Sequence, residues 1–195
     1  MRLLDDLVVH GVVSLWWSVV SCVMVVLCGI IASKGGNYMD LVNGIIPSRS
    51  PSVPRSISKR LTLTTTCTFT PREIHLFSLA FRALEIGLLQ TPSPHPDLYA
   101  TVIFTDKDTV EIKTDSEHLG NWVPIIIYSM HRIRSKRYSD AQFMAITLEE
   151  LCHCFWAIRD EKAVQDKVME LLHLILPNVQ KSDVYNPNWT PDERK

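Results

Sequence analysis

Hydrophobic and polar positions alternate in several short stretches of the chain. Residues 61–69 alternate apolar side chains with threonine, as a half-buried strand does. Residues 99–104 and 109–113 flank a short polar turn and predict a hairpin. Residues 123–128 predict a further strand, in which Pro124 favours the strand's beginning or a sheet edge. These strands are expected to form a small antiparallel sheet.

Apolar residues recur at helical spacing in three other stretches. A Thr-Pro-Arg-Glu capping box at residues 70–73 begins the first helix. The second is capped at Ser139, and the third runs over residues 161–175 until Pro177 ends it. The pattern therefore predicts an α+β fold with a small antiparallel sheet, an upstream helix and two C-terminal helices.

The N-terminal part of the chain has a different character. Residues 11–32 carry no charge and are long enough to cross a bilayer as a helix. Five Lys and Arg residues follow this segment before residue 61, and Arg2 alone precedes it, so the C-terminal domain is expected in the cytoplasm. We predict a single-pass membrane protein. A cleaved signal peptide, a lipoprotein-type Cys22 and a start assigned too far upstream are the alternatives.

The remaining segments are assigned by composition. Residues 1–10 form a short leader, residues 33–60 a serine- and proline-rich linker, residues 61–177 the folded domain, and residues 178–195 a polar, disordered tail. A net charge of −1 supplies no global field that would recruit nucleic acid, so no nucleic-acid partner is expected. The basic run at residues 131–137 favours a solvated surface over a contact with lipid or nucleic-acid phosphates.

The most specific motif is the run Thr-Leu-Glu-Glu-Leu-Cys-His at residues 147–153. In the H-E-x-x-H signature of zincins, two histidines four residues apart bind zinc from one side of a helix, and the glutamate between them activates a water molecule. Here Glu149 stands at the first histidine position, Glu150 at the glutamate position and His153 at the second histidine position. Residues 70–177 therefore resemble a minimal zincin-type metallopeptidase.

This resemblance implies that Glu150 is the general base and that Glu149 and His153 are metal ligands. A carboxylate in place of a histidine shifts the preference toward harder divalent metals than zinc. Glu161 and Glu170 compete as the third ligand, and helical rise places Glu161 nearer to His153 if the two helices turn back on each other. The expected cofactor is zinc, or another divalent metal, held by Glu149, His153 and Glu161.

Zincin-type folds bind the substrate backbone as an added strand, and residues 123–134 are the expected edge for a peptide or protein substrate. Tyr128 and His131 are further candidates for stabilising an oxyanion. The predicted function is membrane-anchored, metal-dependent peptide hydrolysis. One alternative is a non-catalytic module that binds a peptide at the same edge. A minor alternative is a di-iron carboxylate protein, because residues 150–153 and 170–173 form two E-x-x-H pairs.

Overall fold

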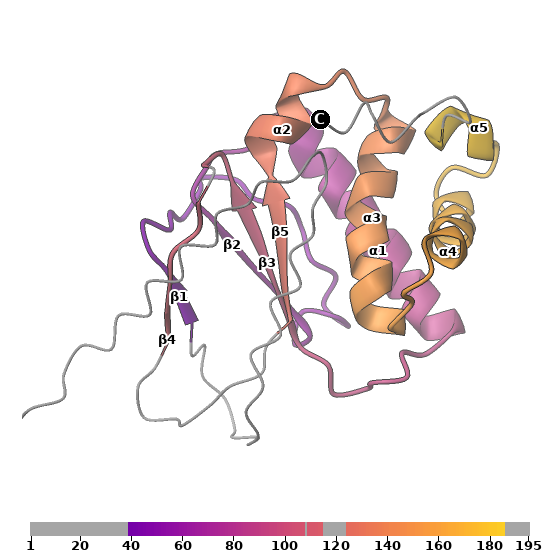
Figure 1. Cartoon of the computed structure of the whole chain (residues 1–195), viewed down its shortest axis with the longest axis horizontal. Coiled ribbons are helices and arrows are strands. Elements are labelled where there is room, and N and C mark those ends of the chain that lie inside the picture. Colours follow the sequence, from indigo (N-terminus) through magenta and orange to yellow (C-terminus); the bar gives the residue numbers. More distant parts are fainter. Residues whose placement is uncertain (1–38, 108, 115–123, 186–195) are drawn as a thin grey trace, which may run out of the picture.

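A computed structural model describes residues 39–107, 109–114 and 124–185, and Figure 1 shows their arrangement. In chain order the elements are β1 (Met39–Leu41), β2 (Leu61–Thr65), α1 (Pro71–Gln90), β3 (Ala100–Thr105), β4 (Ile112–Thr114), β5 (Ile125–Ser129), α2 (Met130–Ser135), α3 (Asp140–Trp156), α4 (Glu161–His173) and α5 (Lys181–Val184).

The main sheet has three parallel strands in the order β2-β3-β5. Thr101 of β3 is aligned with Thr62 of β2 on one side and with Ile125 of β5 on the other. Helix α1 connects β2 to β3 and returns the chain to the same end of the sheet, as a parallel pair requires. Strands β1 and β4 form a separate antiparallel pair.

The predicted antiparallel sheet was wrong. The two stretches expected to form a hairpin belong to different sheets, because β3 pairs with β2 and β5 whereas β4 pairs with β1. Every residue of β3 is buried, as in a central strand of a parallel sheet. The short polar turn after β3 suggested a tight reversal, but strand direction is decided by the long-range pairs on both sides of β3.

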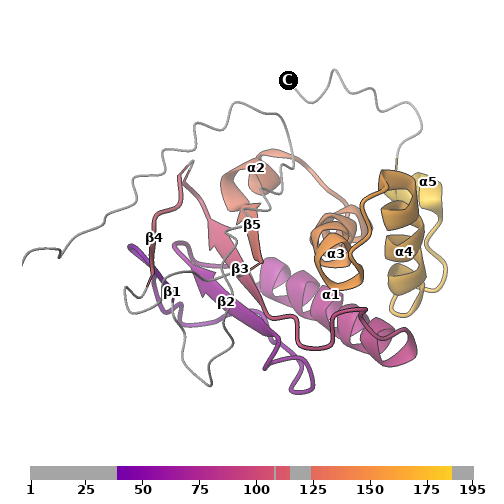
Figure 2. The same ribbon diagram turned by 60° about the horizontal axis from the view of Figure 1, so that its bottom comes forward.

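The helices α1, α3, α4 and α5 lie on one side of the main sheet, and the β1–β4 pair lies on the other side (Figures 1 and 2). Phe77 of α1 lies at the centre of the core, between the helices and the main sheet. Its ring centroid is 4.6 Å from that of Phe104 on β3, 6.0 Å from that of Tyr128 on β5, and 4.8 Å from that of Phe143 on α3. The hydroxyl of Tyr128 donates a hydrogen bond to the Thr147 carbonyl at 2.6 Å, which ties β5 to α3.

The predicted helix starts are confirmed. At the N-terminus of α1, the Thr70 side chain accepts from the Glu73 N–H, and the Glu73 side chain accepts from the Thr70 N–H. Ser139 and Gln142 form the same reciprocal pair at α3. These caps satisfy backbone donors that the first helical turn leaves without partners.

The prediction of a single-pass membrane protein is corrected. Within the described ranges, every helix is too short or too polar to cross a bilayer. Residues 11–32, on which the prediction depended, lie outside these ranges.

Two segments assigned by composition contribute to the core where they are described. In the predicted linker, Ile57 is 4% exposed and belongs to the main hydrophobic cluster. In the predicted tail, Val179 and Val184 are also buried, and α5 packs against the helical layer. A few apolar side chains can therefore hold a mostly polar segment against the domain when they pack into the hydrophobic core.

Candidate functional site

The corner between α3 and α4 holds the sequence-predicted metal residues His153 and Glu161. Helix α3 ends at Trp156, and the left-handed conformation of the capping residue Ala157 (φ 53°, ψ 30°) turns the chain sharply. Asp160 then caps α4 by accepting from the Ala163 N–H at 2.8 Å. The turn brings the carbonyl of Ile158 back over the last turn of α3. We call His153, Ile158 and Glu161 the α3–α4 corner.

The imidazole of His153 is held in one orientation. Its Nδ1 lies 2.6 Å from the Ile158 carbonyl oxygen. Because a carbonyl can only accept, Nδ1 carries the hydrogen, and in the neutral ring the lone pair is on Nε2. Metal-binding histidines in proteins are oriented in this way, with one ring N–H bound to a backbone carbonyl and the other nitrogen facing the ion.

The Nε2 atom of His153 faces Glu161. It lies 3.8 Å from Oε2 of that carboxylate, which is too long for a hydrogen bond. Two ligands of one tetrahedral zinc ion are about 3.3 Å apart, given metal–ligand bonds of about 2.0–2.1 Å. The two atoms therefore stand close to the spacing of metal ligands. The His153 side chain is 24% exposed and that of Glu161 72% exposed, so an ion can reach them from solvent.

The structure distinguishes between Glu161 and Glu170, the two candidates for the third metal ligand. Glu170 is held by Lys167, whose Nζ is 2.7 Å from its Oε1 and 4.7 Å from the centre of the Trp156 ring. Glu161 is the residue that approaches His153, as helical rise indicated.

The two glutamates of the motif differ in burial. Glu150 is 5% exposed, and Glu149 is half-buried one helical turn before His153. Across residues 39–107, 109–114 and 124–185, no three His, Cys, Asp or Glu side chains are close enough together to hold a metal ion. In the described part of the chain the expected three-ligand set is therefore not assembled, and the corner supplies the pair His153 and Glu161.

Tyr185 directly follows α5, which packs against α3. Burial raises the pKa of its phenol far above the ordinary value, and the nearby Glu149 and Glu161 carboxylates raise this pKa further, with Cys152 and Asp166 contributing in the same direction. The phenol therefore stays protonated at neutral pH. Its hydroxyl oxygen is fully buried and has no hydrogen-bond partner among the described residues.

The cysteines next to the motif are core residues, as the sequence indicated. Cys152 is fully buried and Cys154 is 9% exposed. Burial raises the pKa of the Cys154 thiol to about 12 and that of Cys152 still further. A thiol with so high a pKa is neither a nucleophile nor a ready metal ligand at neutral pH.

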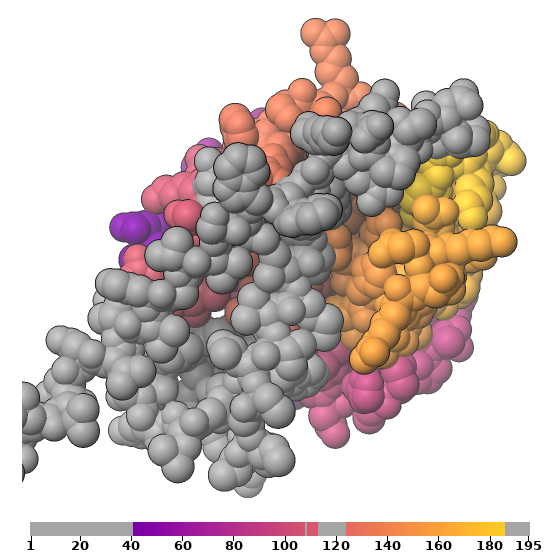
Figure 3. Space-filling view, in the orientation of Figure 1, coloured from indigo at the N-terminus to yellow at the C-terminus, as the bar shows by residue number. Residues whose placement is uncertain are grey.

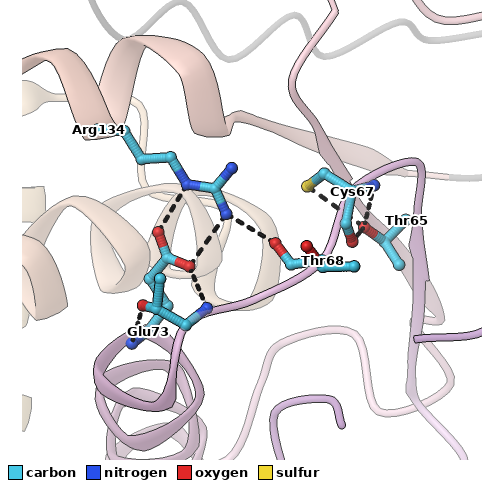
Figure 4. Close-up of polar contacts among 6 residues, drawn as sticks. Thr65, Cys67, Thr68, Glu73 and Arg134 are labelled. Atoms are coloured by element: carbon cyan, nitrogen blue, oxygen red, sulfur yellow. Dashed lines mark hydrogen bonds and ion pairs between the residues drawn. The ribbon is translucent and has the colours of Figure 1, made fainter. Parts of the chain in front are cut away.

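A second polar cluster lies at the carboxyl end of the parallel strands, where open α/β sheets often bind ligands. Figure 4 shows its centre, the pair Glu73 and Arg134. The Arg134 guanidinium donates to both oxygens of the Glu73 carboxylate, at 2.7 and 3.0 Å, and to the Thr68 carbonyl at 2.7 Å. The Thr70 N–H donates to the same carboxylate at 2.7 Å. We call these four residues the sheet-edge network.

The electrostatics of the sheet-edge network are those of a structural ion pair. Burial by itself raises the pKa of Glu73, but hydrogen bonds from Arg134 and Thr70 outweigh it and hold this pKa below the ordinary value. Glu73 in turn raises the pKa of Arg134. Beside the network, burial raises the pKa of the Cys67 thiol, so Cys67 is not an activated nucleophile. These groups satisfy one another and leave little capacity for a ligand.

The sequence pointed to His153 and Glu161, which lie 3.8 Å apart in the structure, but it did not point to Ile158 or Tyr185. Ile158 acts through its backbone carbonyl, which no side-chain motif can reveal. Tyr185 belongs to the segment assigned as a disordered tail, and its one signal was an aromatic residue within a polar stretch. Tyr128, an oxyanion candidate, is buried in the core with its hydroxyl on α3.

Comparisons with protein-family models, with curated proteins and with solved structures find no match to this chain. The resemblance to zincin-type metallopeptidases thus stays a prediction from the motif alone.

Proposed function

We propose that this protein binds a divalent transition-metal ion at the α3–α4 corner, with His153 Nε2 and the Glu161 carboxylate as its first two ligands. The observation that carries the proposal is the orientation of the His153 ring, which is fixed by the Ile158 carbonyl at 2.6 Å with Nε2 turned to Glu161. Imidazole with carboxylate is a donor set that suits zinc and its neighbours in the first transition row.

A simple ion pair between these two side chains explains the geometry less well. At 3.8 Å the contact forms no hydrogen bond, and a solvent-exposed pair of this kind contributes about 0–1 kcal/mol to stability. A direct His–Glu hydrogen bond would draw Nε2 to about 2.7–3.0 Å of the carboxylate. The longer spacing leaves room for an ion between the two atoms.

Glu149 is the residue that helix geometry favours as a third ligand of the proposed metal ion. Glu149 precedes His153 by four residues, so both side chains emerge from the same face of α3. A rotamer change of Glu149 toward the ion would add a third protein ligand, with water in the remaining position. This is the number of protein ligands typical of catalytic zinc.

Peptide hydrolysis is a second candidate function, which the three-residue spacing of Glu150 and His153 in the sequence favours. Glu150 lies three residues before His153, which places the two side chains side by side on α3. A bound zinc ion lowers the pKa of its water ligand and polarises a carbonyl group. Glu150 would accept the proton of that water. Strand β5, the outer strand next to α3, would hold the peptide. A non-catalytic peptide-binding module on the same strand stays an alternative.

The experiment is a zinc titration of the full chain against a competing chromophoric chelator, with metal content measured after dialysis. We expect one zinc ion per chain, and loss of at least tenfold in affinity in both His153→Gln and Glu161→Gln. His173→Gln is the matched control, because His173 also contacts a backbone carbonyl, Val179 O at 2.9 Å. Among the described residues, His173 forms no ion pair with a carboxylate. Equal binding in all three variants would refute the proposal.

A further inference from the structure

The segment between β1 and β2 concentrates positive charge and serine. Residues 41–72 contain five Lys and Arg side chains and no Asp or Glu. Protein kinases select serine substrates largely by the charges around the serine, and an arginine three residues before it is a common determinant. This Arg-x-x-Ser spacing occurs three times in the chain, and the serines concerned are Ser52, Ser58 and Ser135. The structure distinguishes among these three.

Ser58 and Ser135 lie in curled backbone. The Ser58 hydroxyl donates to the Arg55 carbonyl at 2.9 Å, within a run of turns at residues 55–60. The Ser135 hydroxyl donates to the Arg132 carbonyl at 2.8 Å, at the last residue of α2. A kinase binds its substrate as an extended chain, in which an arginine three residues away is about 10 Å from the serine. In both cases the local fold opposes that shape and engages the serine hydroxyl.

Ser52 is presented differently. It lies in an irregular stretch at residues 50–54, and both Ser52 and Arg49 are exposed. Ser52 contacts the domain through its backbone, since its N–H donates to Oγ of Ser78 on α1 at 2.8 Å. A hydroxyl on an exposed, irregular segment is the kind of group that a modifying enzyme can reach.

Apolar neighbours hold this stretch in place on either side of Ser52. Pro51 is buried, and Val53 packs against the hydrophobic core. Helix α1, which carries Ser78, contributes to the molecular surface, and part of it is seen below α3 and α4 in Figure 3. Backbone and apolar contacts therefore dock the stretch on the domain, and its exposed polar side chains remain available to a partner.

The charges around Ser52 suit a phosphate group, which adds about −1.5 to −2 charge at neutral pH. Arg49 and Arg55 are three residues away on either side. Arg82 follows the contact residue Ser78 by one helical turn on the same face of α1. Its side chain is 60% exposed and pairs with Glu85, and a guanidinium has enough N–H donors for a second anion. A phosphate at Ser52 would therefore meet positive charge.

We propose that Ser52 is a phosphorylation site for an arginine-directed serine kinase, which recognises Arg49. In the reaction the Ser52 hydroxyl oxygen attacks the γ-phosphorus of ATP, its proton passes to the catalytic base of the kinase, and ADP leaves. This inference concerns the segment before β2 and is independent of the proposed metal site.

The test incubates the folded full chain with a purified arginine-directed serine kinase and Mg-ATP, and it maps the phosphate by mass spectrometry over a time course. We expect one phosphoryl group per chain, on Ser52. Ser52→Ala removes the acceptor hydroxyl but keeps the N–H that binds Ser78, so it should fold normally and take up no phosphate. Arg49→Gln should lower the rate at least tenfold, and the matched control Arg55→Gln should change it less than twofold.

A synthetic peptide of residues 46–61 serves as the unfolded reference, because it carries both Arg-x-x-Ser sites without the domain. We expect the peptide to be phosphorylated on Ser52 and Ser58, whereas the folded chain is phosphorylated on Ser52. Equal modification of both serines in the folded chain overturns the inference, since the fold would then make no selection. A folded chain that stays unmodified at Ser52 also overturns it, because docking on α1 would then shield the serine.

Discussion

The sheet-edge network and the α3–α4 corner both place a carboxylate beside a cationic or potentially cationic side chain. They differ in the burial of the carboxylate and in the distance between the paired groups. The Glu73 carboxylate is 7% exposed and accepts from Arg134 and from a backbone N–H at 2.7–3.0 Å. The Glu161 carboxylate is 72% exposed and lies 3.8 Å from His153. In the first cluster the donors and acceptors are matched, whereas the two side chains of the second are too far apart to form a hydrogen bond with each other.

The difference separates a structural ion pair from the proposed metal site. A buried carboxylate is stable only when its lone pairs are occupied, so the sheet-edge network is complete without a ligand. The corner holds an imidazole oriented by a backbone carbonyl beside an exposed carboxylate, and these are two groups that a metal ion could join. The carboxyl end of the parallel strands is the usual ligand position in this class of sheet. Here the helical corner is the better candidate.

The largest expected effect comes from breaking the sheet-edge network with Arg134→Met. The variant leaves the Glu73 carboxylate buried without its guanidinium, and we expect a loss of about 2–3 kcal/mol in the free energy of unfolding by urea. This is less than for a fully buried pair, since the Arg134 side chain is 36% exposed. Zinc binding at the corner should be unchanged.

The matched control for that variant is Arg72→Met. Arg72 also pairs with a carboxylate, Asp140, at 2.7 Å, but both side chains are more than half exposed. Its loss should cost no more than about 1 kcal/mol. Equal costs for the two arginine variants would mean that burial does not distinguish the sheet-edge network from an ordinary surface ion pair.

An intermediate effect is expected from Gly87→Ala, which acts on the corner through packing. A Cβ at Gly87 of α1 would lie 2.2 Å from Cδ2 of the buried Leu171 on α4. Overpacking of this kind costs about 1–3 kcal/mol and the gain in helix propensity returns about 1 kcal/mol, so a net loss of up to about 2 kcal/mol is expected. Since α4 carries Glu161, zinc affinity should fall as well.

Leu89→Ala is the control for Gly87→Ala. Leu89 lies on the same helix and is 73% exposed, so its truncation should change stability by about 0.5 kcal/mol or less. A Gly87→Ala protein with unchanged stability and zinc affinity would show that α4 has room to move away from α1 without disturbing the corner.

The smallest effect is a pH dependence that belongs to the sheet-edge network. The pKa of Glu73 is lower in the folded chain than its ordinary value of 4.5. Its stabilising contribution is therefore fully present above that value and is lost as the pH falls through the folded pKa. Urea melts at pH 7 and at steps below pH 4.5 should show the wild type losing more stability than Glu73→Gln. Parallel pH profiles would exclude the stated role of this carboxylate.

The helices could be predicted from the sequence because their signals are local. Capping boxes at residues 70–73 and 139–142 mark the starts of α1 and α3, and apolar spacing marks their buried faces. Strand direction could not be predicted in this way. Apolar alternation is the same in parallel and antiparallel strands, and the choice depends on the crossover through α1 and on pairs distant in sequence.

For the candidate site, the sequence by itself determined that Glu149, Glu150 and His153 share one side of a helix, since spacings of three and four residues dictate it. Only the tertiary structure decided that Glu161 rather than Glu170 faces the imidazole and that the Ile158 carbonyl orients it. The reason is physical. Helical periodicity is set by neighbouring residues along the chain, whereas the meeting of α3, α4 and α5 is set by how their apolar faces pack into one core.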